Sequence, residues 1–366
     1  MTRILHIIPS LGVGGTEKIL LEICRGLDRS RFEHEVLSLK SGGQAAEALT
    51  SEGIPVSPLD SPDGFWPGLL DLPRLFFDLS RRIRDRRPDV VHTWLTRANL
   101  IGRLAARLVG SRHVVSSLRV MEKEKIYHLW AERFTHFLCE AVTVNCTALR
   151  DFAARELSIP PEKIRLIFNG IRPVEREPSY HRRGAEGSFA VGTMGRLHKQ
   201  KGIDIFLEAM PSVLEKYSKC TFEIAGDGPE KKNLAALSEK LGIQDRVRFA
   251  GTVPSIQFLS GLDVFVLASR WEGMPNVVLE AMALGKPVAA AAVGGVTDLI
   301  ENGIDGLIFA PGSPSSCATE ILRLLESGPL RRNLGDSAKK IVSEKFTMAA
   351  MLTAHASLYE SIVSGP

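Results

Sequence analysis

The stretch that decides the fold runs from Ser269 to Gly285 and reads Ser-Arg-Trp-Glu-Gly-Met-Pro-Asn-Val-Val-Leu-Glu-Ala-Met-Ala-Leu-Gly. It follows a short apolar run, residues 263–267, whose β-branched residues and flanking turn residues predict a buried parallel strand. After the loop that holds Glu272 and Gly273, a helix is predicted over about 276–284. The loop therefore connects the carboxyl end of a strand to the start of a helix, where open α/β sheets bind ligands and where free amides favour anionic oxygens.

Two carboxylates of this stretch are candidates for ligand binding. Glu272 lies in the loop, and Glu280 lies one turn inside the predicted helix, so both can reach a ligand that lies over the helix start. A carboxylate accepts two or more hydrogen bonds and suits sugar or ribose hydroxyls. A solvated loop glutamate and a helix glutamate favoured by the dipole would give the same pattern, so the pair alone does not decide between the two interpretations.

The segment from Glu272 to Glu280, Glu-Gly-Met-Pro-Asn-Val-Val-Leu-Glu, resembles the Glu-x7-Glu signature of family 4 glycosyltransferases, which are retaining enzymes of the two-domain GT-B fold. Three further segments match the family in the same order along the chain and extend the resemblance over nearly all of it. They are Leu11–Glu17, a glycine loop, Gly195–Gly202, a basic loop, and Ala225–Glu230, a turn after a strand.

The resemblance and the alternation of strands and helices predict an α/β protein with two Rossmann-like, doubly wound domains facing across a cleft. A length of 366 residues fits two domains of ordinary size. The expected organisation is an N-terminal acceptor-side domain, a polar linker rich in Pro and Gly, a C-terminal domain that binds the donor nucleotide, and a C-terminal helix crossing back to the first domain. The corresponding bounds are 1–172, 173–187, 188–346 and 347–366.

Composition places the chain among globular proteins that act in a reducing compartment. The hydrophobic and charged fractions are 44% and 24%, and no window of about twenty apolar residues predicts a membrane span. Five cysteines without metal-ligand spacing are expected to be reduced and mostly buried, and the N-terminus reads as a strand, so we expect a cytoplasmic protein. A net charge of +4 fits a diphosphate ligand or an anionic membrane surface and does not call for nucleic acid.

Two features of the first half are candidates for the site. Gly14 and Gly15 follow the first predicted strand, where the absence of a Cβ lets the backbone approach a ligand, although a tight strand-to-helix turn explains them as well. His92 lies near the end of a strand over residues 88–94, and the resemblance implies that it contacts the donor sugar, whereas a structural histidine is the alternative. The charged and aromatic region 118–136 is predicted to form an acceptor-side loop and helix, with plain surface as the alternative.

Arg196 and Lys201 flank a turn directly after a strand, so both cations are expected over the same ligand. They suit the charge that develops on a departing diphosphate, and a basic surface turn is the alternative. Since the sequence has no Asp-x-Asp pair in a setting that suggests a metal-held diphosphate, no metal ion is implied, and no cofactor is expected besides the nucleotide-sugar substrate.

The resemblance assigns roles to the remaining positions. It implies that Glu280 binds the ribose hydroxyls and that Glu272 binds hydroxyls of the transferred sugar. Donor binding is also implied for the residues around the start of the helix: Gly273, Met274, Asn276 and Val277.

The stretch from Phe65 to Arg87 combines an apolar stripe with six arginines. It predicts either a helix that covers the sheet or an interfacial helix on an anionic membrane.

The resulting hypothesis is a retaining, metal-independent glycosyltransferase that moves a sugar from a nucleoside-diphosphate sugar, with a UDP-sugar favoured, to a glycan or lipid-linked acceptor in cell-surface polysaccharide synthesis. The alternatives are a nucleotide-sugar sensing protein without transferase activity and a GT-B nucleotide-sugar epimerase. A Rossmann dehydrogenase is disfavoured, because the loop with Gly14 and Gly15 lacks the third glycine of the dinucleotide fingerprint.

Overall fold

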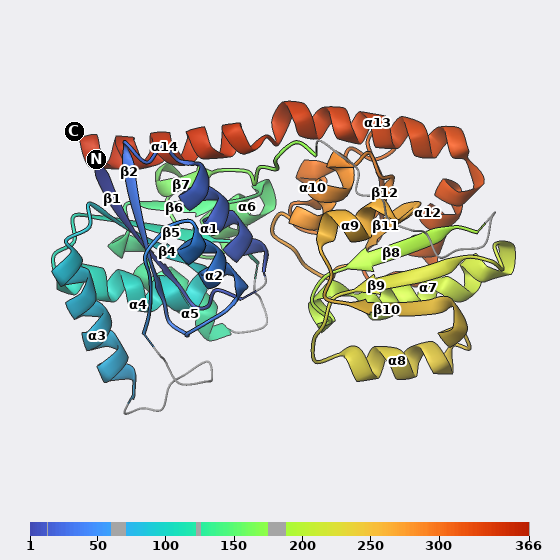
Figure 1. The fold of residues 1–366 in the computed structure, drawn as a ribbon, viewed down its shortest axis with the longest axis horizontal. Coiled ribbons are helices and arrows are strands. Elements are labelled where there is room, and N and C mark those ends of the chain that lie inside the picture. The colour runs from blue at the N-terminus through green and yellow to red at the C-terminus, as the bar shows by residue number, and fades with distance from the viewer. Residues whose placement is uncertain (13, 60–70, 122–125, 175–187, 366) are drawn as a thin grey trace. The chain divides into compact units, whose positions relative to one another are not determined.

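The computed structural model of the chain describes all residues except 13, 60–70, 122–125, 175–187 and 366 (Figure 1). The chain forms two compact units. Unit 1 comprises Met1–Asn169 and Ala349–Pro366, and unit 2 comprises Gly170–Met348. Most of the predicted linker, 173–187, lies outside the described residues.

Unit 1 is built on a seven-stranded sheet with the order β3-β2-β1-β4-β5-β6-β7, in which every paired strand is parallel. Its strands are β1 Thr2–Ile8, β2 Phe32–Ser38, β3 Val56–Pro58, β4 Val90–Trp94, β5 His113–Leu118, β6 Ala141–Val144 and β7 Ile164–Leu166. Its helices are α1 Gly15–Gly26, α2 Gln44–Ser51, α3 Asp71–Arg86, α4 Leu95–Leu108, α5 Ile126–Thr135, α6 Thr147–Arg155 and α14 Met348–Ser364, with the 3-10 turns η1 His136–Leu138 and η2 Pro161–Lys163.

Unit 2 is built on a six-stranded parallel sheet with the order β10-β9-β8-β11-β12-β13. Its strands are β8 Ala190–Met194, β9 Thr221–Ala225, β10 Val247–Gly251, β11 Val264–Leu267, β12 Val288–Ala291 and β13 Leu307–Phe309. Its helices are α7 Ile203–Lys216, α8 Lys231–Lys240, α9 Ser255–Ser260, α10 Asn276–Ala283, α11 Val296–Leu299, α12 Pro314–Glu326 and α13 Gly328–Lys345, with the 3-10 turns η3 Lys199–Lys201 and η4 Gln244–Arg246.

The apolar runs of the sequence become the central strands, as expected for sheets covered on both faces. All four residues of β11, of β12 and of β6 are buried. Helix starts also follow local chemistry, because Ser313 and Ser327 cap α12 and α13 by accepting hydrogen bonds from backbone amides inside each helix. Two doubly wound parallel α/β units confirm the predicted fold class.

Helix α14 completes unit 1, although it follows unit 2 in sequence. Tyr359 and His355 of this helix are fully buried, and the Tyr359 hydroxyl lies 2.7 Å from Nδ1 of His92. Glu360 forms an ion pair with Arg31 at the surface. The last residues of the chain therefore pack against strands from the first third of it.

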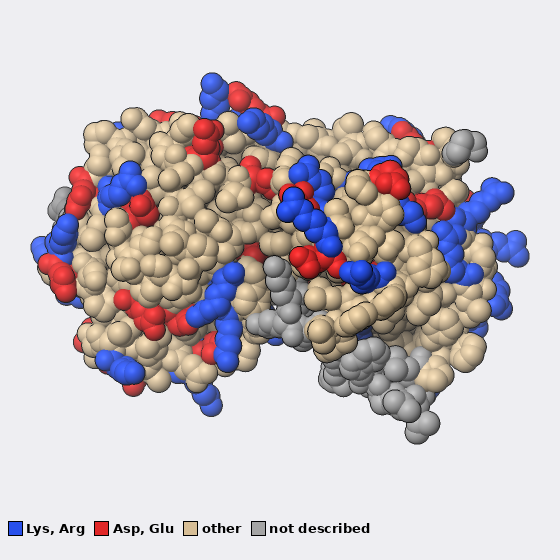
Figure 2. All heavy atoms as spheres, turned by 180° about the vertical axis from the view of Figure 1, so that it is seen from behind, with Lys and Arg blue, Asp and Glu red and all other residues tan. Residues whose placement is uncertain are grey.

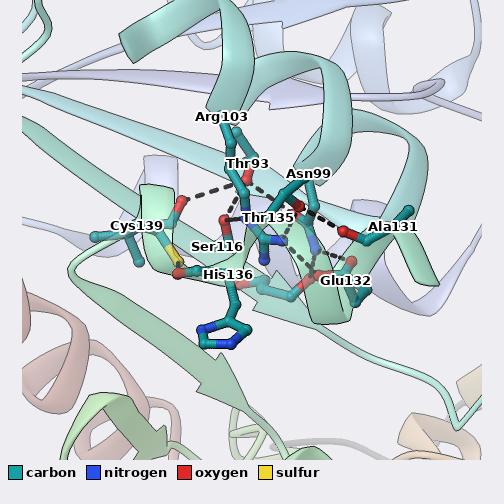
Figure 3. A network of polar contacts seen from close by, with 11 residues as sticks. Thr93, Asn99, Arg103, Ser116, Ala131, Glu132, Thr135, His136 and Cys139 are labelled. Carbon is teal, nitrogen blue, oxygen red and sulfur yellow. Dashed lines mark hydrogen bonds and ion pairs between the residues drawn. The ribbon is translucent and has the colours of Figure 1, made fainter. Parts of the chain in front are cut away.

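A buried polar network joins α4 and α5 to the sheet (Figure 3). Arg103 of α4 and Glu132 of α5 form an ion pair at 2.7 Å, and their side chains are 0% and 4% exposed. Arg103 also donates to the hydroxyls of Ser116 at 2.7 Å and Thr135 at 3.0 Å. The amide of Asn99 donates to Glu132 at 2.8 Å. The network fixes α5 against α4 and β5.

The stretch predicted to dock on a membrane is only partly described, because Phe65 and the residues up to 70 lie outside the described residues. The described part is α3, whose arginines largely have acidic partners. Asp78 pairs with Arg81 and Arg82, and Glu35 pairs with Arg86. Among the described helices, none is both long enough and apolar enough to cross a bilayer.

The five cysteines, at positions 24, 139, 146, 220 and 317, are buried and form no disulfide, as the sequence predicted.

Candidate functional site

The carboxyl edge of the sheet in unit 2 contains the switch point of the strand order. β8 and β11 are neighbours, and the chain adds β9 and β10 on one side of them and β12 and β13 on the other. The loops after β8 and β11, 195–202 and 268–275, therefore flank the place where open α/β sheets bind ligands.

Backbone contacts fasten these two loops to each other. Gly202 has a φ of +59°, and a Cβ on it would lie 1.9 Å from the carbonyl oxygen of Ala268. The amide of Arg270 donates to the carbonyl of Gln200 at 2.8 Å, and Nε2 of Gln200 donates to the carbonyl of Trp271 at 3.0 Å. A side chain at position 202 would force the loops apart, so the glycine is required by this contact.

The contact brings together Lys201 and Glu272, which the sequence analysis assigned to different parts of a ligand. Nζ of Lys201 lies 2.6 Å from Oε1 of Glu272, and the hydroxyl of Ser269 donates to the same oxygen at 2.7 Å. Glu272 is 5% exposed, and the Lys201 side chain is 21% exposed. Within the described residues, Oε2 of Glu272 has no hydrogen-bond donor, so this oxygen can accept from a ligand.

Arg196 begins the turn that ends with Lys201 and Gly202. Its side chain is exposed and makes no hydrogen bond or ion pair with any described residue. A guanidinium without a partner among the described residues, in the same turn as Lys201, offers donors that suit a phosphate oxygen.

Helix α10 begins directly after the loop that contains Glu272. Its first residues, Asn276 and Val277, are half-buried, while Gly273, Met274 and Glu280 are buried. The carbonyl of Gly273 accepts from the amide of Gly295 at 2.7 Å, which ties the loop to the one after β12. The structure thus brings residues 272–280, Arg196 and Lys201 to one edge of one sheet, and their roles in donor binding stay predictions.

The remaining predicted residues belong to unit 1. Gly14 precedes α1 in an extended conformation, and its carbonyl accepts from the amide of Lys18. Gly15 is the first residue of α1 and is exposed, and the glycine loop follows β1 at the carboxyl edge of this sheet.

His92 lies in the middle of β4 and not at its end, because the strand continues to Trp94. It is fully buried, with Nδ1 bound to the hydroxyl of Tyr359 and Nε2 bound to the hydroxyl of Ser117 at 2.8 Å. Burial lowers the pKa of His92 well below its usual value, and the neighbouring His6 acts in the same direction. In the described conformation both ring nitrogens are occupied, so a contact with a sugar requires a rearrangement, and the predicted role of His92 stays a prediction.

Among the described residues, one cluster has the composition of a metal site: His6, Cys24 and His34, all buried. The hydrogen bonds argue against metal binding. The indole N–H of Trp94 can only donate, so Nδ1 of His6, 3.1 Å away, must accept. Neutral His6 then carries its proton on Nε2 and donates it to Nδ1 of His34 at 3.0 Å, which leaves neither nitrogen of His6 free as a metal ligand.

One residue of these edges, Ser269, was given no role by the sequence analysis, and a second, Arg119, was placed only within the acceptor-side region 118–136. Ser269 lies inside the quoted stretch, and its position three residues before Glu272 was the available signal. Arg119 follows β5 in unit 1, is 5% exposed and lies over the ring of Trp94 at 4.7 Å. It donates to Asn169 at 3.0 Å, while its Nε and Nη2 have no partner in the described residues, and burial lowers its pKa to about 10. Nothing in the local sequence indicated that this arginine is buried.

Comparison with known proteins identifies the family. Residues 13–175 match the family described as Glycosyltransferase Family 4, and residues 180–341 match Glycosyl transferases group 1. An uncharacterized glycosyltransferase of Methanocaldococcus jannaschii is 31% identical over 281 residues, which cover 71% of this chain and 72% of that protein. The chain belongs to glycosyltransferase family 4.

One further relative and one solved structure are similar to the chain in sequence and in fold, respectively. The UDP-Gal:alpha-D-GlcNAc-diphosphoundecaprenol alpha-1,3-galactosyltransferase of Escherichia coli is 27% identical over 286 residues, or 72% of this chain and 73% of that protein. The crystal structure of Anabaena HepE in complex with UDP and glucose superposes with a TM-score of 0.85 at 24% identity, covering 99% of this chain and 100% of that chain. The structural likeness confirms the predicted GT-B fold.

Proposed function

We propose that this glycosyltransferase uses a nucleoside-diphosphate sugar, with a UDP-sugar favoured, and transfers the sugar with retention of configuration to a glycan or lipid-linked acceptor in cell-surface polysaccharide synthesis. The observation that carries the proposal is the Lys201–Glu272 pair at the switch point of unit 2, in the same turn as Arg196, whose side chain has no partner among the described residues. This arrangement offers cations and a carboxylate oxygen at one place.

The charges match the demands of the reaction. When the glycosidic bond breaks, negative charge develops on the departing diphosphate, and Arg196 and Lys201 would stabilise it. Glu272 holds Lys201 by Oε1 and keeps Oε2 for hydroxyls of the transferred sugar. Glu280, in the second turn of α10, would take the ribose hydroxyls, and the first amides of α10 would meet phosphate oxygens.

Relatives support the proposed donor and acceptor classes. The E. coli relative is named for UDP-Gal and a diphosphoundecaprenol-linked sugar, and the HepE structure holds UDP and glucose. We extend these classes, a UDP-sugar and a lipid-linked or glycan acceptor, to this chain. A cytoplasmic location would give it access to nucleotide sugars.

Retention and independence from metal complete the proposal. Attack from the face that the diphosphate leaves would retain configuration, with the diphosphate itself acting as the base. Because protein cations meet the diphosphate in this scheme, no divalent ion is needed for charge neutralisation.

Transfer kinetics with alanine variants test the proposal. Detergent extracts that contain lipid-linked glycans would supply the acceptor, and a set of UDP-sugars would supply the donor. Release of UDP would be the measured signal. Arg196→Ala and Lys201→Ala should each lower kcat/KM by about 30- to 1000-fold, the range for loss of one preorganised charge donor. Arg323→Ala, which removes an exposed arginine paired with Glu320 on α12, is the matched control and should change kcat/KM less than threefold.

The same measurements separate the alternatives. UDP binding without UDP release in any acceptor mixture would indicate a sensing protein, and conversion of the donor without an acceptor would indicate an epimerase. Wild-type kinetics in both Arg196→Ala and Lys201→Ala would show that the charge assignment is wrong.

A further inference from the structure

Helix α5 and the turn η1 expose an apolar face in unit 1. Their outward residues recur at helical spacing and are large: Ile126, Tyr127, Trp130, Phe134 and Phe137. Trp130, Phe134 and Phe137 are 53%, 59% and 64% exposed, and the rings of Trp130 and Phe134 stack with centroids 5.2 Å apart. A folded protein rarely leaves this much aromatic surface in contact with water without an interaction partner.

The neighbouring helix extends this face. α4 packs against α5 and exposes Leu104 and Leu108, one turn apart. On the side of the molecule drawn in Figure 2, the surface over these helices consists mainly of residues other than Lys, Arg, Asp and Glu. We call the exposed residues of α4, α5 and η1 the α4–α5 face.

Two of the arginines near the face are paired with acids, Arg103 with the buried Glu132 and Arg107 with Glu140 at 3.6 Å, and Arg133 supplies exposed positive charge. The described residues of α4, α5 and η1 include four arginines, at positions 97, 103, 107 and 133, and a single acid, Glu132. Glu132 is buried in its ion pair with Arg103, so it contributes no negative charge to the surface (Figure 3). Arg133 lies on the exposed side of α5 and donates only to a backbone carbonyl, that of Glu156, so its charge is not neutralised.

The face is also held rigidly. The Arg103–Glu132 ion pair and the bond from Asn99 to Glu132 fix α5 to α4, so the aromatic rings are presented on a preformed surface. A rigid apolar face requires no folding step on binding, which lowers the cost of docking.

We propose that the α4–α5 face docks unit 1 on a bilayer that contains anionic lipids. Trp, Tyr and Phe side chains are suited to the boundary between headgroups and acyl chains, and arginines beside them are attracted to anionic headgroups. A second copy of the chain fits less well, because a two-fold interface would bring the same arginines of both copies together. The inference goes beyond the proposed function and stands without it, since it concerns a surface and not the reaction.

The proposal replaces the expected site of membrane contact, 65–87. In α3 the arginines at 81, 82 and 86 have acidic partners, while Arg74 and Arg84 of α3 and Arg133 of α5 are exposed and have no acidic partner among the described residues, so the choice between the two helices rests on the apolar surface. Aromatic exposure is greater on α5, because α3 shows one large exposed apolar side chain in its described part, Phe77.

Vesicle flotation of the full chain tests the proposal. Vesicles of phosphatidylcholine with 0 to 40% phosphatidylglycerol would be used at low and high salt. Binding should rise with phosphatidylglycerol, fall with salt, and weaken at least tenfold in the Trp130→Ser/Phe134→Ser variant. Arg133→Glu should weaken it by about fivefold or more, since each basic residue near such a surface contributes roughly that factor.

Two further variants test whether vesicle binding is specific to the α4–α5 face. Ile304→Ser removes a residue that is 52% exposed in unit 2 and should leave vesicle binding unchanged. Trp130→Phe keeps the apolar face, so it should bind vesicles while losing the part of the fluorescence that brominated lipids quench in the wild type. Loss of quenching in this variant would place position 130 inside the bilayer.

Several outcomes would overturn the proposal. Equal flotation with neutral and anionic vesicles, or wild-type binding by Trp130→Ser/Phe134→Ser, would exclude the α4–α5 face. A dimer in light scattering that the same variant dissociates would identify a second copy as the occupant. If vesicle binding is lost only when Arg81, Arg82, Arg84 and Arg86 are replaced by Gln, the membrane contact lies on α3.

Discussion

Removal of the Glu132 carboxylate should destabilise unit 1 far more than removal of an exposed carboxylate. In Glu132→Ala, Arg103 would keep its bonds to the hydroxyls of Ser116 and Thr135 but lose its counter-charge, while its side chain is 0% exposed. Asn99 would lose the acceptor of its 2.8 Å bond. The variant therefore leaves a buried charge without compensation, and the amide nitrogen of Asn99 keeps only its bond to the carbonyl of Ser117.

The magnitude follows from the geometry. With the charge centres roughly 4 Å apart and an effective dielectric constant of about 20, the Coulomb attraction is about 4 kcal/mol. Breaking a buried ion pair costs about 3–5 kcal/mol in general, which agrees. For a unit of this size, that loss corresponds to a decrease in Tm of about 6–20 °C.

Because the chain has two units, the assay must report on unit 1 alone. Unfolding in urea can be monitored by hydrogen exchange of the backbone amides in peptides from β4, β5 and α4, which report on unit 1. Peptides from unit 2 serve as an internal reference. Glu326→Ala is the matched control, since the pair of Glu326 with Lys216 is exposed and such pairs contribute about 0–1 kcal/mol. The double variant Arg103→Met/Glu132→Leu should recover most of the loss, because it removes both charges and keeps apolar volume. A loss below about 1 kcal/mol in Glu132→Ala would refute the reasoning, and so would a double variant less stable than the single one.

Three further predictions concern other parts of the chain. Transfer activity should survive excess EDTA, and complete loss that Mg²⁺ or Mn²⁺ restores would contradict the cationic clamp of Arg196 and Lys201. Gly202→Ala should lower both Tm and activity, because its Cβ would lie 1.9 Å from a carbonyl oxygen, and wild-type melting would contradict the described loop contact. Burial lowers the pKa of His34 to about 4 and that of His355 to about 3. Their stabilising effect is complete above the unfolded pKa of about 6.5 and is lost as pH falls towards those values, by up to about 1.4 kcal/mol per pH unit for each histidine. Stability of unit 1 that stays constant between pH 6.5 and 5 would contradict this.

The sequence allowed the two parallel sheets to be predicted, since buried strands of a parallel sheet are near-continuous apolar runs. The run before Ser269 became β11, and the glycine loop after the first strand became the start of α1. The boundaries of strands were less certain, because burial of a strand end depends on its neighbours. The strand of His92 shows this, since it was predicted over 88–94 and begins only at Val90, while its end at Trp94 packs against His6 of β1 and His355 of α14.

Side-chain partners were harder to predict than positions. Lys201 and Glu272 are 71 positions apart and were each assigned to a ligand, while the structure joins them to each other. Their contact depends on Gly202 passing Ala268, which is a relation between two loops that no local pattern contains. Arg103 is a similar case, because a helix arginine is normally solvated, and its burial depends on Glu132 in another helix.

The two sheets have similar strand orders but carry different side chains at their switch points. This difference bears on which unit would bind a diphosphate. In unit 1, β1 and β4 adjoin at the switch point, and His6 and His92 lie opposite each other there, neutral and covered by Tyr359. In unit 2, the corresponding edge between β8 and β11 presents the exposed Arg196, which has no partner in the described part of the chain, and the partly exposed Lys201 of the same turn. A dianionic leaving group needs fixed cations that do not have to be uncovered first. The cation near the switch point of unit 1, Arg119, is only 5% exposed, whereas Arg196 of unit 2 is exposed, and this difference supports the proposal that unit 2 binds the diphosphate.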